Sequence, residues 1–305
     1  MSRPLISVVV PFYQAEATLD AALESLAASA FGDFEVLLVD DASRDGGSEL
    51  ARDRERRDAR FRYARNEENR GVAHARNRAL EMATGEWLAF VDADDRVSAD
   101  WLGNLLEDAR ASGAEVVIGR AQKVCEGAVG DYRMEGLKRR GALTFADIVF
   151  KDNSVLWNKL YARELIRRTG ARFDEGLQIG EDLLFNFVVL REARGLFYGG
   201  KGTYFHCVDN PASVMRGTGA AGRVEQYARL LERLETAAAE AGLGRHPALR
   251  KVARDLLMDH YRSGTPAPDE ATWRRIMRID RSLSWRVKAS VWRKVLRQRL
   301  AGRAE

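Results

Sequence analysis

A short apolar run that ends in three carboxylates constrains this chain more than any other stretch. Trp87 to Val91 predicts a buried strand, and Asp92, Asp94 and Asp95 follow at its C-terminal end. Three like charges beside a core repel one another unless a cation compensates them. A divalent metal that carries a phosphorylated ligand would do so. The alternative is a solvated acidic loop that caps a helix starting near Ser98.

Apolar runs alternate with segments of helical periodicity through the first 112 residues. The runs predict strands at 5–11, 34–40 and 86–91, and the spacing predicts helices at 15–29, up to about 58, and at 72–83, with Gly85 at the C′ position of the last. This alternation predicts an α/β fold with a mostly parallel sheet flanked by helices. Right-handed crossovers then bring the strand ends to one edge, where the second strand ends in Asp40 and Asp41.

The pattern changes beyond residue 112. We expect a strand at 115–119, a hairpin or mobile loop from Arg120 to Gly141, and a short helix capped by Thr144. A strand and a helix follow across 153–168. Gly180-Glu181-Asp182 then opens a helix, 196–208 is an aromatic-rich strand, and the chain is helical from Gly222 onward.

Several classes of site are excluded by missing motifs. No GxGxxG follows the first strand, and no GxxxxGK[ST] or nucleophile elbow occurs. The four histidines show no metal-ligand spacing, and Cys125 and Cys207 lie far apart, as expected for inert buried thiols. No run of eighteen uncharged apolar residues and no signal-peptide pattern is present, so we expect a cytoplasmic protein.

The chain resembles glycosyltransferase family 2 in five segments that occur in order between about residues 4 and 210. They are ISVVVPFY from Ile6, FEVLLVDDAS from Phe34, NRGVAHARNRAL from Asn69, GEWLAFVDADD from Gly85 and Gly180-Glu181-Asp182. Gln14 departs from the Asn that is usual in the family, which puts only the detail of the first motif in doubt. The resemblance implies a GT-A fold, with a catalytic domain at 1–215, split near residue 95 into nucleotide and acceptor halves. A helical extension at 216–305 would follow.

The resemblance also implies roles for the donor-side residues. Pro11 and Tyr13 would line the nucleobase pocket, and Asp41 would accept hydrogen bonds from the base. Arg76 would lie near the nucleotide. Asp92 and Ala93 would contact the ribose or the donor sugar. Asp94 of the DxD motif would bind Mn²⁺ or Mg²⁺ at the two phosphates, whereas Asp95 would either help it or supply charge at a helix N-terminus.

The acceptor-side roles follow from the last motif and from the aromatic strand. Asp182 would be the general base that deprotonates the acceptor hydroxyl, and Glu181 would support it or bind the acceptor. The alternative is a helix N-cap. His206 could be a further metal ligand or acceptor contact, although a packed, hydrogen-bonded histidine is the simpler interpretation. Trp157 and Lys159 could contact either substrate, or could be a core tryptophan and a solvated lysine.

These implied roles describe an inverting, hexosyltransferase-type enzyme that uses a nucleoside-diphosphate sugar, with UDP favoured, and a glycan or lipid-linked acceptor. Two rival interpretations stay open: a sugar-nucleotide-binding protein without transferase activity, and a nucleotidyltransferase. The second lacks its expected Gly-rich, basic phosphate loop after the first strand.

The C-terminal residues carry the basic charge of the chain. Residues 271–305 contain eleven Lys and Arg against two acidic residues, a net charge of +9, so the remainder is −5 within a total of +4. Val291, Trp292 and Val295 repeat at helical spacing between basic residues. This pattern predicts an amphipathic helix at the inner membrane surface, or one that packs its apolar stripe on the catalytic domain. Nucleic acid is not expected as a partner because the rest of the chain is net negative and carries no binding motif.

Overall fold

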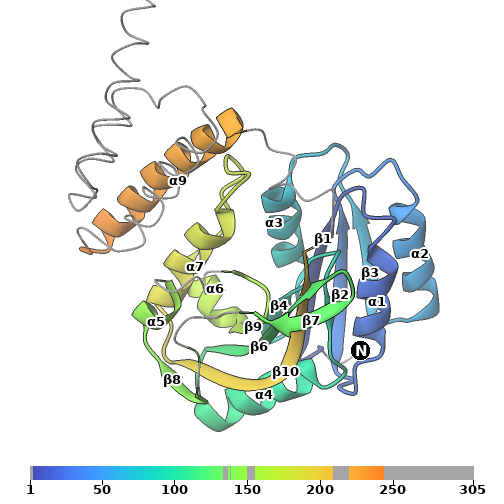
Figure 1. Ribbon diagram of the computed structural model, residues 1–305, viewed down its shortest axis with the longest axis horizontal. Helices are drawn as coiled ribbons and strands as arrows, with labels where there is room; N and C mark the ends of the chain where they lie inside the picture. Colours follow the sequence, from blue (N-terminus) through green and yellow to red (C-terminus); the bar gives the residue numbers. More distant parts are fainter. Residues whose placement is uncertain (1–2, 133–136, 138, 150–154, 209–219, 244–305) are drawn as a thin grey trace, which may run out of the picture. The chain divides into compact units, whose positions relative to one another are not determined.

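The computed structural model describes residues 3–132, 137, 139–149, 155–208 and 220–243 of the chain. The chain divides into two compact units, which are described separately. One comprises Met1–Gly176 and Glu181–Pro211, and the other comprises Leu177–Gly180 and Ala212–Glu305. The first unit is an α/β fold built around one sheet (Figure 1).

Within the described residues the sheet has ten strands in the order β3-β2-β1-β4-β9-β6-β10-β5, with β7 beside β6 and β8 beside β10. The strands are β1 (Ile6–Phe12), β2 (Phe34–Asp40), β3 (Phe61–Arg65), β4 (Trp87–Phe90), β5 (Arg96–Val97), β6 (Val116–Cys125), β7 (Ala128–Asp131), β8 (Gly141–Leu143), β9 (Lys159–Ala162) and β10 (Leu196–Cys207). Every residue of β1 and β2 is buried, as expected for strands that are covered on both faces.

The two halves of the sheet differ in strand direction. β3, β2, β1 and β4 pair in parallel, as their βαβ connections predict. Beyond β4 the sheet is mixed, because β9 pairs antiparallel with both β4 and β6, while β6 and β10 are parallel. A single strand pattern carries no information on direction, so this insertion was not visible in the sequence.

Helices cover both faces of the parallel half. In the first unit they are α1 (Leu19–Ala27), α2 (Gly47–Arg57), α3 (Val72–Met82), α4 (Trp101–Ser112), α5 (Phe145–Val149), α6 (Arg163–Thr169) and α7 (Glu181–Arg191). The main apolar core contains Val8 of β1, Leu23 of α1 and Trp101 of α4. α3 packs on β1 and β2 from the opposite face (Figure 1).

Parallel pairing places the C-terminal ends of β1, β2 and β4 on one edge, as predicted. Phe12 is in register with Asp40, and Val9 with Phe90. The acidic segments that follow β2 and β4 therefore emerge together. Gly85 does not have the predicted role of a left-handed helix cap, since α3 ends at Met82 and its C-cap residue Ala83 already has an extended backbone. Gly85 instead lies against β1, where a Cβ would come within 2.6 Å of the Ser7 nitrogen.

The second half of the unit follows the sequence pattern with two local corrections. The predicted hairpin is formed by β6 and β7. Thr144 caps α5 by a reciprocal pair of hydrogen bonds with Asp147. The prediction that both cysteines are buried is wrong, because Cys125, at the end of β6, is exposed and Cys207 is only partly buried. Lys159 is fully buried rather than solvated, whereas Trp157 is a core residue.

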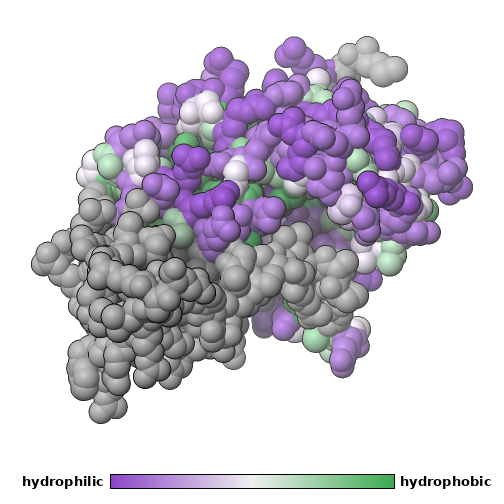
Figure 2. All heavy atoms as spheres, turned by 90° about the horizontal axis from the view of Figure 1, so that it is seen from above, coloured by the Kyte–Doolittle hydropathy of each residue, from purple (hydrophilic) through white to green (hydrophobic). Residues whose placement is uncertain are grey.

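In the second unit, α9 (Ala220–Glu240) buries Leu230, Leu231 and Leu234. The Gln178 backbone N–H donates to the Gln226 side-chain oxygen at 2.7 Å, which ties the segment before α7 to this helix. Among the helices of the described residues, none has both the length and the apolarity needed to cross a bilayer. The predicted basic helix near the C-terminus lies outside the described residues. The described surface seen in Figure 2 is mostly hydrophilic.

Candidate active site

Asp40, the last residue of β2, has a structural role. Its carboxylate is fully buried and accepts hydrogen bonds from the Ser43 backbone N–H at 2.7 Å, the Tyr63 hydroxyl at 2.9 Å and Arg65 at 2.8 Å. Burial by itself would raise the pKa of Asp40, but hydrogen bonds from Ser48, Ser43 and Tyr63 hold it below its usual value. Asp40 therefore closes the turn after β2 and leaves Asp41 at the edge of the sheet.

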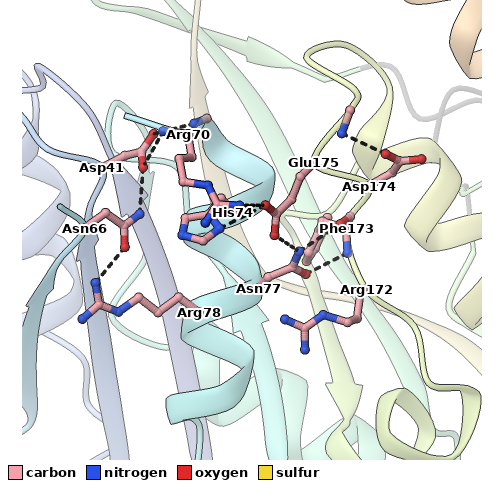
Figure 3. Close-up of polar contacts among 12 residues, drawn as sticks. Asp41, Asn66, Arg70, His74, Asn77, Arg78, Arg172, Phe173, Asp174 and Glu175 are labelled. Atoms are coloured by element: carbon pink, nitrogen blue, oxygen red, sulfur yellow. Dashed lines mark hydrogen bonds and ion pairs between the residues drawn. The ribbon is translucent and has the colours of Figure 1, made fainter. Parts of the chain in front are cut away.

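Asp41 fixes the loop that leads into α3. It is 2% exposed, and its carboxylate accepts bonds from Asn66 Nδ2 at 2.7 Å and from the backbone N–H groups of Arg70 and Gly71, the latter at 2.6 Å (Figure 3). Gly71 has φ of +90°, a conformation that glycine adopts without strain. The Asp41 carboxylate, for which a nucleobase contact was predicted, therefore already holds the backbone of this loop in place.

A second polar cluster connects α3 to the segment before α7. Glu175 accepts hydrogen bonds from Arg70 at 2.9 Å and Asn77 at 3.2 Å, and it lies 3.1 Å from His74 Nδ1 (Figure 3). Asn77 also exchanges two 2.9 Å hydrogen bonds with the Phe173 backbone. The motif from Asn69 to Leu80 located these α3 side chains, but sequence reasoning missed their partner Glu175.

Arg76 joins the acidic loop after β4 to the start of α7. Its guanidinium donates to Glu181 Oε1 at 2.7 Å and to Asp92 Oδ1 at 3.1 Å. The side chain is 6% exposed and stacks over Phe173, and its Nε has no hydrogen-bond partner among the described residues. The structure thus brings together Arg76, Asp92 and Glu181, which lie on three separate segments. Of these, Asp92 is the more open, with a side chain 33% exposed.

Glu181 and Asp182 occupy the first turn of α7. Asp182 Oδ1 accepts a 2.6 Å hydrogen bond from the Leu183 backbone N–H, so the predicted N-terminal position is confirmed. Burial and the neighbouring Asp182 charge raise the pKa of Glu181 to about 7. Burial also raises the pKa of Asp182, although the positive charge of Arg76 opposes that rise. Burial thus favours the protonated form of both carboxyls, and Glu181 can hold and release a proton near neutral pH.

Asp95 points into the protein. Its fully buried carboxylate accepts hydrogen bonds from the Tyr204 hydroxyl at 2.6 Å and the Cys207 backbone N–H at 2.7 Å, and it lies 3.3 Å from His206 Nδ1. Burial raises the pKa of Asp95 to about 6. Asp95 therefore anchors β10 to the acidic loop, a role that differs from both predicted alternatives.

His206 packs in an aromatic cluster beside this anchor. Its ring stacks on Trp157 with centroids 5.0 Å apart at 17°, and the Tyr132 ring lies edge-on at 5.8 Å. Trp157 also stacks on Tyr204 at 4.8 Å. This arrangement agrees with the packed interpretation of His206, although no sequence motif indicated that Trp157 would contact it.

The family of the chain follows from comparison with known proteins. The family model described as "Glycosyl transferase family 2" matches residues 7–171, which is more than half of the chain. The chain belongs to glycosyltransferase family 2. The matched region contains three of the five motifs, all but Ile6 of a fourth, and the residues Asp41, Arg76, Asp92 and Asp94.

Two bacterial glycosyltransferases illustrate the relatives of this family 2 chain. It is 30% identical over 232 residues to the "Uncharacterized glycosyltransferase EpsJ" of Bacillus subtilis (strain 168), covering 69% of this chain and 63% of that one. It is 37% identical over 107 residues to the Escherichia coli "UDP-Glc:alpha-D-GlcNAc-diphosphoundecaprenol beta-1,3-glucosyltransferase WfgD", covering 35% of this chain and 40% of that one. The match therefore spans less than two thirds of the length of either relative.

Solved structures confirm the predicted fold class. S. aureus TarS 1-349 in complex with UDP-GlcNAc superposes with a TM-score of 0.66 at 24% identity, covering 84% of this chain and 72% of that one. The mannosyltransferase PcManGT from Pyrobaculum calidifontis, in complex with GDP-Man and Mn²⁺, superposes with a TM-score of 0.57 at 19% identity, covering 87% and 77%. The α/β fold, with helices flanking a central sheet, is thus the GT-A fold expected from the sequence.

The side chains of the DxD segment offer oxygen ligands only. Asp92 and Asp94 are both partly exposed in the turn after β4, whereas Asp95 is turned inward. Within the described ranges, no cluster of three or more His, Cys, Asp or Glu side chains could hold a metal by itself. Hard oxygen donors with open positions suit Mg²⁺ or Mn²⁺ when a phosphorylated ligand supplies the remaining oxygens. The residues present therefore fit a metal that is shared with a diphosphate.

Proposed function

We propose that this chain is an inverting glycosyltransferase that moves a sugar from a nucleoside-diphosphate sugar to a hydroxyl of a glycan or lipid-linked acceptor. The observation that supports the proposal best is the bridge made by Arg76, which binds Asp92 after β4 and Glu181 at the start of α7. One buried side chain thereby holds the proposed donor residues beside the proposed acceptor residues.

The donor nucleotide would lie over the ends of β1 and β2. Tyr13, which follows β1 and is 43% exposed, offers a ring for a nucleobase beside Pro11. Three groups already make four hydrogen bonds to Asp41, two on each oxygen, so a base N–H would share an oxygen that one of them now contacts. We favour a UDP-sugar, since the TarS structure is a complex with UDP-GlcNAc and WfgD is a UDP-Glc glucosyltransferase.

The diphosphate and donor sugar would lie over the segment after β4. Asp94 would hold Mn²⁺ or Mg²⁺ together with phosphate oxygens, while Asp92 and the adjacent Ala93 would contact the ribose or the donor sugar. When bound, the metal would offset the negative charge that develops on the departing diphosphate. His206 is a secondary candidate for a metal ligand. Its Nδ1 faces Asp95, so only Nε2 could bind a metal.

Asp182 would take the proton from the acceptor hydroxyl. Its Oδ1 is oriented by the Leu183 N–H, and burial raises its pKa, which makes the carboxylate a stronger base than an exposed aspartate. The acceptor oxygen would form a bond to the anomeric carbon from the face opposite the diphosphate, whose bond to that carbon breaks, so the configuration inverts. Glu181, held by Arg76, would support the base or bind the acceptor.

Product analysis with a panel of sugar nucleotides and Mn²⁺ tests the proposal. The wild-type chain should release a nucleoside diphosphate, and D182N should bind the donor normally but turn over about 10²- to 10⁴-fold more slowly. D20N, which changes an exposed carboxylate on α1, is the matched control. Near wild-type turnover in D182N would refute the base assignment. Binding without turnover would indicate a sugar-nucleotide-binding protein, and release of pyrophosphate a nucleotidyltransferase.

A further inference from the structure

Lys159 of β9 is a buried cation that the proposed chemistry does not use. Its side chain is 0% exposed, and its ammonium donates to the Val155 carbonyl at 2.5 Å and to Asn158 Oδ1 at 3.1 Å. Both acceptors are neutral, and no carboxylate of the described residues forms an ion pair with Lys159. A buried ammonium is strongly disfavoured unless a negative charge compensates it.

Hydrogen bonds place this ammonium beside α7. The Val155 carbonyl that binds Lys159 also accepts a 3.2 Å hydrogen bond from Asn186 Nδ2 of α7. Asn186 is held in turn by the Tyr161 hydroxyl at 2.8 Å. Asn186 follows Asp182 by four residues, so the two side chains lie on the same face of the helix, one turn apart. Lys159 therefore lies next to the face of α7 that carries Asp182.

The other charged groups around Asp182 are already paired. Arg76 approaches from α3, Asp92 from the loop after β4, and Glu181 from α7 itself, and Arg76 hydrogen-bonds both of these carboxylates. The remaining titratable neighbour on β9 is the Tyr161 hydroxyl, which is neutral because burial raises its pKa well above the usual value. Among the described residues, Arg76 and Lys159 are thus the cations that offset the charge of Asp182, and Lys159 is the one that forms no ion pair with another carboxylate. Burial lowers the pKa of Lys159 to about 7, and attraction to Asp182 opposes that fall.

We propose that Lys159 is a positioning residue that keeps the Asp182 carboxylate in its ionised, proton-accepting form. The inference rests on the assignment of Asp182 as the base. Lys159 exchanges no proton in the step: the acceptor proton passes to Asp182 while the new glycosidic bond forms and the bond to the diphosphate breaks. The positive charge lowers the free energy of the ionised carboxylate before that transfer.

The pH dependence of kcat/KM in K159Q tests this inference. Without the cation, the acid limb of the profile should move up by about one pH unit. Activity near pH 6 should then fall about tenfold and return to the wild-type plateau near pH 9. The KM for the donor should stay constant. K159R, which keeps the charge, should retain the wild-type limb, and K159M serves as the second neutral variant if K159Q does not fold.

The outcomes separate this inference from the proposed function. A K159Q profile that superimposes on the wild-type profile, or that is lowered equally at every pH, overturns the role of Lys159. If the K159Q profile is unshifted but D182N is inactive in the same assay, the role of Lys159 is wrong and the proposed function stands. Full activity in D182N overturns the base assignment and the role of Lys159 together, because there would be no ionised base for Lys159 to maintain.

Discussion

Tyr204 donates a 2.6 Å hydrogen bond to Asp95, across 109 residues of sequence, and so ties β10 to the loop after β4. The backbone of Cys207 adds a second bond to the same carboxylate at 2.7 Å. Because Asp95 is held inside, the acidic run divides into an inward anchor and two partly exposed carboxylates, Asp92 and Asp94. The anchor fixes the backbone that presents the other two.

The first prediction concerns this anchor. Y204F removes the hydroxyl but keeps the ring, so the buried Asp95 carboxylate loses a donor and the free energy of unfolding should fall by about 1–3 kcal/mol. Urea denaturation measures the change. Y198F is the control on the same strand, because the Tyr198 hydroxyl has no hydrogen bond to the described part of the chain. Equal effects of the two substitutions would show that Asp95 does not depend on Tyr204.

The second prediction concerns Arg76. R76M leaves Asp92 and Glu181 buried or half-buried without their shared cation, so unfolding free energy should fall by about 3–5 kcal/mol. R76K should recover only part of this loss, since a lysine has no planar fork to reach both carboxylates.

Donor binding and urea denaturation of the wild-type, R76M and R76K proteins check the Arg76 prediction. R172M is the matched control, because Arg172 pairs with Glu81 on the surface and such a pair contributes about 1 kcal/mol or less. If R76M were no less stable than R172M, the bridge would not hold the two halves of the site together.

The sheet edge was predictable from the sequence because its signals are local. Apolar runs ending in Asp40 and Asp92 mark parallel strands and their C-terminal ends without reference to the rest of the fold. Gly85 shows the limit of local rules. Its position after a helix predicted a cap, but the requirement for glycine comes from close contact with Ser7 of β1.

The internal contacts of the site were not predictable, since they depend on tertiary pairing. The motifs located Arg76 and Glu181, but nothing local indicates that they bind each other across 105 residues. Lys159 was expected in solvent or at a substrate, because a lysine is seldom fully buried. Its burial results from β9 entering the sheet antiparallel between β4 and β6.

The third prediction concerns pH. Burial and Asp182 raise the folded-state pKa of Glu181 from 4.5 to about 7, so the folded protein holds this proton more tightly than the unfolded chain does. The resulting stability is complete below about pH 4.5 and is lost as pH rises through about 7. E181Q lacks this pH-dependent contribution to stability because a glutamine side chain does not ionise. The free energy of unfolding of E181Q, taken relative to that of wild type, should therefore rise by up to about 3 kcal/mol between pH 5 and pH 8.

Urea denaturation of both proteins at the two pH values measures this difference. Asp95 and Asp182 also have raised pKa values, but they are present in both proteins and largely cancel from the comparison. E107Q, which changes an exposed carboxylate on α4, is the control and should track wild type. A stability difference between E181Q and wild type that does not change with pH would show that Glu181 is already ionised at pH 5.

The last prediction concerns the C-terminal residues and the proposed lipid-linked acceptor. Each cation near an anionic surface contributes about 1 kcal/mol, so residues 271–305, with a net charge of +9, should carry the full chain onto vesicles rich in phosphatidylglycerol at low salt. Binding should be weak on phosphatidylcholine and should fall steeply in 0.5 M salt, where the Debye length is only about 4 Å.

Reversing Arg293, Lys294, Arg297 and Arg299 to Glu should abolish vesicle binding in co-sedimentation, while release of nucleoside diphosphate in solution persists. If the reversed variant still binds vesicles, these four basic residues are not the membrane contact. If the wild-type chain does not bind them, the alternative in which the helix packs on the catalytic domain is favoured.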